Sequence, residues 1–128
     1  HGFYLVGLND YAGTAVADMT WSQSLNNTAA TVFVVSSTVA LTGADDPFIE
    51  DRVGYGVGGG VMAPEGTAAP LPEEGASIER KALENGACIV AEGSGELLGN
   101  GCDTNDNSAD VSVRTVPLAQ NTGGSVEP

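Results

Sequence analysis

The stretch GCDTNDNSADVSVRT, near the end of the chain, gathers side chains that could hold a cation. Its aspartates, Asp103, Asp106 and Asp110, carry the carboxylate oxygens that calcium binds in proteins. An EF-hand loop starting at Asp103 would need glycine at its sixth position and glutamate at its twelfth. This chain has Ser108 and Arg114 there, so the stretch is not an EF-hand. Two interpretations stay open: a looser, weak calcium site, or a polar turn whose side chains bond their own backbone.

The two cysteines, Cys88 and Cys102, frame the glycine-rich segment CIVAEGSGELLGNGC. A disulfide that closes a loop of about 15 residues can stabilise a protein by about 3 kcal/mol. The alternative is a pair of buried free thiols. Because the rest of the chain has the character of a secreted protein, we predict the disulfide, which implies an oxidising compartment.

The candidate catalytic and cofactor motifs are incomplete. His1 is the only histidine, so neither a copper site of two histidines nor a Ser–His–Asp or Cys–His catalytic group can be assembled. The GxGxxG pattern at 54–59 is followed by VMAPEGTAAPLP, which cannot form the helix that a phosphate site needs. We therefore predict that the chain is not an enzyme and has no cofactor apart from weakly bound calcium.

The charge of the chain limits the classes of molecule that it could bind. Seventeen acidic residues against four basic ones give a net charge of −13. This charge repels nucleic acids and anionic membranes, and it favours solubility. The sequence also lacks an apolar run of about 18 residues, so we predict no membrane insertion.

Strand patterns separated by turns dominate the sequence. The most pronounced is ATVFVVS at 30–36, which is rich in β-branched and aromatic residues. No helical period persists, and a glycine- and proline-rich segment follows Tyr55. We predict an all-β fold, an immunoglobulin-like β-sandwich with long Gly/Pro-rich loops, over residues 1–116, and a flexible tail over 117–128. The strands are expected at 3–8, 15–21, 30–36, 48–55, 76–81 and 110–115.

Adjacent charges on one of these strands have a simple interpretation. Glu50 and Asp51 should point to opposite faces, so they do not form an acid–base pair. Asp51 beside Arg52 is expected to form a surface ion pair of little energetic value.

Three segments resemble the bacterial lamin-tail domain, an immunoglobulin-like sandwich. FIEDRVGYG at 48–56 is similar to the family's DRVGYG strand. EGTAAPLPEEGASIERK at 65–81 is similar to its loop and strand of the form EGTPAPAP…GSLERK. DTNDNSADVSVRTVPLAQN at 103–121 resembles its closing DTDDNAADFVVRTPPTPQN. The family's opening strands, with INEV, WIEL and DLSGW segments, have no counterpart, and the segment between the cysteines is an addition.

This resemblance implies a non-catalytic module, extracellular or at the cell surface, that serves adhesion, anchoring or assembly. The partner would be another protein, or another copy of the chain, bound through the sheet edges. A sandwich without its first strands exposes open edges, so an upstream segment or another chain is expected to supply them. The alternatives are a subunit of an extracellular filament built by strand complementation, and an accessory domain of a secreted hydrolase.

Overall fold

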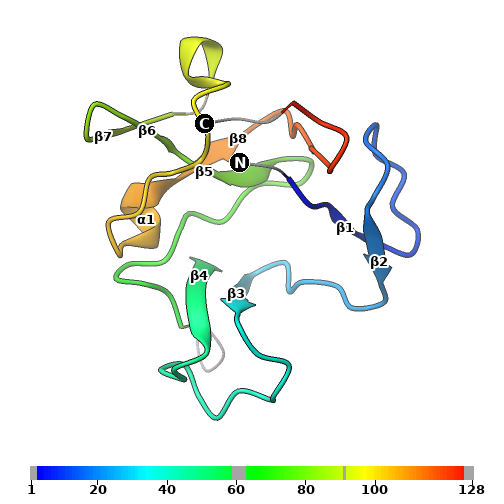
Figure 1. Ribbon diagram of the computed structural model, residues 1–128, viewed down its shortest axis with the longest axis vertical. Coiled ribbons are helices and arrows are strands. Elements are labelled where there is room, and N and C mark those ends of the chain that lie inside the picture. Colours follow the sequence, from blue (N-terminus) through cyan, green and yellow to red (C-terminus); the bar gives the residue numbers. More distant parts are fainter. Residues whose placement is uncertain (1–2, 59–62, 91, 126–128) are drawn as a thin grey trace.

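The computed structural model describes residues 3–58, 63–90 and 92–125 (Figure 1). His1 and part of the GxGxxG segment lie outside these ranges, so the predictions made on them are not tested. The described elements are mostly strands, with one short 3-10 helix, η1 (Gly93–Gly95), and one four-residue α-helix, α1 (Asn107–Asp110), which confirms an all-β protein. The strands are β1 (Val6–Leu8), β2 (Met19–Trp21), β3 (Ala29–Val35), β4 (Ile49–Gly56), β5 (Ser77–Arg80), β6 (Ala82–Glu84), β7 (Ala87–Ile89) and β8 (Val111–Arg114).

Strands β3 and β4 form an antiparallel pair, with Val32 opposite Val53 and a register shift between Val34 and Val35. The connection between them contains a turn at Asp45-Asp46-Pro47. One carboxylate oxygen of Asp46 accepts a hydrogen bond from the backbone N–H of Thr42 and the other accepts one from that of Phe48, at 2.9 and 3.0 Å. These bonds lower the pKa of Asp46 and hold the loop compact.

Strands β5 and β8 form a second antiparallel pair, with Ile78 opposite Val113 and Arg80 opposite Val111. The β3–β4 and β5–β8 pairs, which we call the two layers, pack against each other in a shared core, and β3–β4 lies below β5–β8 in Figure 1. The small core between them consists of buried side chains, with three half-buried ones packed against it. The buried members are Tyr55, Ala69 and Val111, and the half-buried ones are Ala30, Val53 and Ile78.

Strands β6 and β7 form a hairpin that the sequence did not predict. Its two-residue turn is Asn85-Gly86, with φ of 50° and 80°. Positive φ at both central positions is the type I′ geometry that Asn-Gly favours. The segment that we interpreted as a glycine-rich loop from Cys88 to Cys102 therefore begins inside β7.

Strands β1 and β2 pair in parallel and lie apart from the layers (Figure 1). Residues 121–124 come back to this region. The Asn121 side chain donates to the carbonyl of Val16 at 2.8 Å, and the backbone N–H of Thr122 donates to the Asp18 carboxylate at 3.0 Å. The segment predicted as a flexible tail is thus bonded to the β1–β2 region at these residues.

The described strands form four separate two-stranded sheets and bury little apolar surface. The fully buried hydrophobic residues are mostly small, and many large ones are exposed, among them Leu25, Val32, Val34 and Leu71. The immunoglobulin-like sandwich therefore stays a prediction, while its coarser class, all-β, is what the structure has.

Candidate functional site

The acidic stretch GCDTNDNSADVSVRT at 101–115 contains a short helix rather than a plain turn. Helix α1 spans Asn107–Asp110, and Asp106 caps its start. The Asp106 carboxylate accepts hydrogen bonds from the hydroxyl and the backbone N–H of Ser108, at 2.8 and 3.0 Å. These bonds lower the pKa of Asp106 and satisfy an N–H group that the helix itself cannot.

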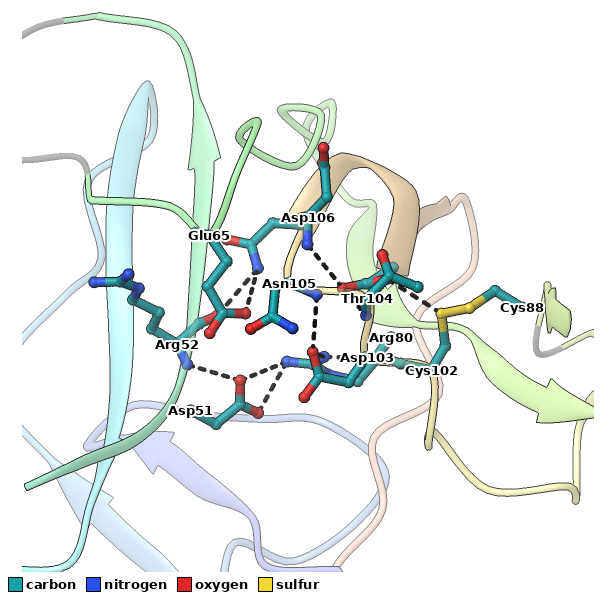
Figure 2. A network of polar contacts seen from close by, with 12 residues as sticks. Asp51, Arg52, Glu65, Arg80, Cys88, Cys102, Asp103, Thr104, Asn105 and Asp106 are labelled. Carbon is teal, nitrogen blue, oxygen red and sulfur yellow. Dashed lines mark hydrogen bonds and ion pairs between the residues drawn. A yellow bond between two sulfur atoms is a disulfide. The ribbon is translucent and has the colours of Figure 1, made fainter. Parts of the chain in front are cut away.

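Asp110 is fully buried at the other end of α1. Its carboxylate accepts bonds from the backbone N–H and the hydroxyl of Thr104, at 2.9 and 2.7 Å, and one from the N–H of Asp106. Beside it, the predicted Cys88–Cys102 disulfide is present, and Cys102 Sγ lies 3.3 Å from Asp110 Oδ1 (Figure 2). Since a disulfide sulfur carries no proton, this is a packing contact. Asp110 therefore fixes the Thr104–Asp106 turn against the disulfide.

The three aspartates do not come together as a calcium site. Within the described part of the chain, one group of three potential ligand residues lies close enough together to hold a metal ion, and it consists of Cys88, Cys102 and Asp110. Both sulfurs of that group are consumed by the disulfide, so it does not offer a thiolate site. Asp103 instead accepts from the backbone N–H of Asn105 at 3.2 Å and faces Arg80. The polar-turn interpretation describes this geometry better than the calcium site.

Calcium is expected to leave the thermal unfolding midpoint unchanged, because the carboxylates of Asp106 and Asp110 are already bound to backbone and hydroxyl donors. Differential scanning fluorimetry in millimolar calcium, and then in chelator, measures this. A midpoint that rises with calcium, and does not rise in an Asp106→Ala variant, would contradict it and restore the weak site.

Asn107 holds this region to the layers through three side-chain hydrogen bonds, which we call the Asn107 clamp. Sequence reasoning missed this role. Its buried side-chain oxygen accepts from the backbone N–H groups of Gly54 and Glu65, at 2.7 and 3.1 Å. Its side-chain nitrogen donates to the carbonyl of Arg52 at 3.1 Å. No local pattern indicates its partners, because Gly54 and Arg52 lie on β4 more than fifty residues earlier in the chain and Glu65 lies 42 residues earlier.

Figure 2 shows an ion-pair network formed by Asp51, Arg80 and Asp103. The Arg80 guanidinium binds both carboxylate oxygens of Asp51, at 2.8 and 2.9 Å. The prediction that Asp51 pairs with Arg52 is therefore wrong, because the two side chains leave β4 on opposite faces. The Arg52 guanidinium instead donates to the carbonyl of Ala44. Arg80, mostly buried, joins β5 to β4 across the two layers.

Glu65 lies beside this network (Figure 2), where Arg52 and Arg80 offset only part of the effects that raise its pKa. Burial raises the pKa of Glu65 above its ordinary value of 4.5, and the negative charges of Asp51 and Asp103 raise it further. Since the raised pKa belongs to the folded state, ionised Glu65 destabilises the fold at neutral pH. That cost disappears as the pH falls below 4.5, where both states bind the proton.

A Glu65→Gln variant is therefore expected to unfold at a higher temperature than the wild type at pH 7. Glutamine keeps the oxygen that faces the Asn107 side chain, at 3.4 Å, and removes the charge. Thermal unfolding of both proteins from pH 7 to pH 4 measures the difference, which should shrink toward the acid end. A variant less stable than the wild type at pH 7, or a difference independent of pH, would contradict the assignment.

A groove of about 910 Å³ opens between the two layers. Val32, Val53 and Tyr55 line it from β3–β4, and Ile78 and Val111 line it from β5–β8. Residues 25–27, just before β3, and 71–74, before β5, also line it. Its volume is in the range of about 300–1,000 Å³ that is typical of ligand sites. The groove continues the small core outward, so a bound group would extend that core.

Comparison with known proteins gives no matching family model, no matching curated protein and no matching solved structure. The helices in the described ranges are also too short to cross a membrane. The geometry of the site combines an apolar groove, strand edges that pair with no other described strand, and the Asn107 clamp near a disulfide.

Proposed function

We propose that this chain is a non-catalytic binding module, extracellular or at the cell surface, that holds protein segments for adhesion, anchoring or assembly. One observation carries the proposal: the apolar groove stands open between two-stranded layers whose large side chains remain exposed. Val32 has 42% of its surface exposed, Leu25 has 51% and Leu71 has 40%. Large apolar side chains are exposed elsewhere on the chain as well, and those that line this groove form a concave surface suited to association.

The polar network supports this proposal because it stiffens the layers that carry the groove. The Asp51–Arg80 pair and the Asn107 clamp join β4 to β5 and to α1. A preorganised scaffold loses little conformational entropy when a partner binds. The disulfide supports the proposed location, since such bonds persist in oxidising compartments. A lamin-tail-like sandwich, which the sequence resembles, is the finer fold that we propose.

A filament subunit assembled by strand complementation is the second candidate, and the unpaired strand edges favour it. Each described sheet contains only two strands, so edges that can accept a strand are present. The charge opposes it, because copies that each carry −13 repel one another at low ionic strength. Light scattering over a range of concentrations and salt separates the two, since only the filament grows with concentration.

Panning a phage-displayed library of random dodecapeptides against the oxidised chain tests the first proposal. We expect enrichment of peptides in which apolar residues alternate with polar ones, the pattern of a strand with one buried face. Serum albumin serves as the control target. Failure to enrich any peptide beyond that control, or hydrolysis of peptide, polysaccharide or nucleic acid substrates by the chain alone, would contradict a binding module.

A further inference from the structure

We propose that the groove between β3–β4 and β5–β8 binds one extended segment of a partner protein, in which apolar residues alternate with lysine or arginine. The segment would pair with the outer edge of β3 and insert its apolar side chains between the layers. This inference rests on the proposed function and specifies the place and the chemistry of the partner.

The apolar side chains in the walls of the groove favour an apolar occupant. Val32 and Val53 are opposite one another on the face that lines it, and Leu25 and Leu71 flank them. Covering these partly exposed side chains removes apolar surface from water, which is the main favourable term in association. The alternate residues Ala30, Val32 and Val34 share one face of β3, so an adjoining strand would present its own alternate side chains to the same groove.

The backbone explains why the occupant is a strand. Strand β4 already has a partner on each edge at its C-terminal end: β3 on one side and Ala69 on the other, through an isolated bridge to Tyr55. Among the described strands, β3 pairs only with β4. With respect to the described strands, its outer edge therefore retains backbone donors and acceptors that an incoming strand can satisfy. A compact apolar ligand would fill the groove but leave that edge unpaired.

The charges explain why the segment is basic. Glu73 and Glu74 line the groove and are exposed, and the chain as a whole carries −13. The one cation in the walls, Arg80, is bound bidentately by Asp51. Alternation turns the basic residues of the segment away from the groove, where the net negative charge of the chain attracts them and favours encounter. A second copy of the chain is disfavoured because its charge has the same sign.

The test uses the full oxidised chain and a fluorescein-labelled peptide of alternating valine and lysine, about ten residues long, the upper end of ordinary strand lengths. A second peptide of equal charge has prolines at two central valines and cannot pair as a strand. Fluorescence anisotropy measures both affinities. The Val32→Asp variant is compared with Val39→Asp, a control at an exposed valine outside the groove.

We expect the proline peptide to bind about tenfold more weakly or worse, and Val32→Asp to weaken the valine–lysine peptide by about as much, a factor that corresponds to about 1.4 kcal/mol. Both aspartate variants add one negative charge, so attraction by charge alone would tighten binding in both. Loss confined to Val32→Asp therefore reports the groove. Circular dichroism checks the fold, and Leu71→Asp, in a loop, repeats the test should Val32→Asp unfold.

The proposal is overturned if the proline peptide binds as tightly as its parent, or if Val32→Asp and Leu71→Asp bind as tightly as Val39→Asp. It is also overturned if sedimentation shows a wild-type dimer that Val32→Asp dissociates, since a second copy then fills the groove. In these cases the module itself survives if panning still enriches peptides. Only the absence of enrichment removes the proposed function as well.

Discussion

An Asn107→Ala variant is expected to lose about 3 kcal/mol or more of unfolding free energy, because buried groups left without partners cost about 1–3 kcal/mol each. The substitution would leave the N–H groups of Gly54 and Glu65 and the carbonyl of Arg52 without the side-chain bonds they now make. It would also leave a gap between α1 and β4. Urea denaturation followed by circular dichroism measures the loss.

Two further variants sharpen this prediction. Asn107→Asp keeps the shape of the side chain but removes its donor and buries a charge, so it should also destabilise. Asn27→Ala changes an exposed asparagine and should stay within about 0.5 kcal/mol of the wild type, as ordinary surface substitutions do. An Asn107→Ala protein as stable as Asn27→Ala would show that the clamp contributes nothing to the fold.

Loss of the disulfide is the second large effect that we expect. The bond joins residues 14 positions apart. A Cys88→Ala/Cys102→Ala variant should lose about 3 kcal/mol, because the cross-link restricts the unfolded chain. Alanine at position 102 would also leave space beside the buried carboxylate of Asp110, which adds to the loss. Urea denaturation of the oxidised wild type and of the variant measures it.

Reductant supplies the internal control for the disulfide. The wild type should lose stability when it is reduced, whereas the double-alanine variant should show the same midpoint with and without reductant. If reduction leaves the wild-type midpoint unchanged, the bond either does not form in solution or does not restrict the unfolded state, and the prediction is wrong.

The strands and the disulfide could be predicted from the sequence because their signals are local. The β-branched run at 30–36 and the alternation at 76–81 and 110–115 match β3, β5 and β8 closely. The turn at Asp45-Asp46-Pro47 rests on the same kind of local signal, an aspartate that bonds nearby backbone and is followed by proline. In these cases side-chain period and turn chemistry determine the conformation with little help from the rest of the chain.

The features that define the candidate site depend on contacts between distant segments. Nothing near Asn107 indicates that its amide binds the backbone of β4, and Asp51 has Arg52 beside it in sequence but Arg80 beside it in space. The β6–β7 hairpin was missed for another reason: its Asn-Gly turn was a usable local signal, but its strands are only three residues each. The groove itself arises from the packing of two strand pairs, which no single pattern encodes.

Hydrogen–deuterium exchange of the chain, alone and with the valine–lysine peptide, tests most directly whether the open groove receives a partner strand. We predict that amides on the outer edge of β3 exchange rapidly in the isolated chain and become protected when the peptide binds, whereas those of β6 and β7 do not change. Protection confined to segments away from β3 and the groove, or β3 amides already protected in the monomeric chain, would contradict the account.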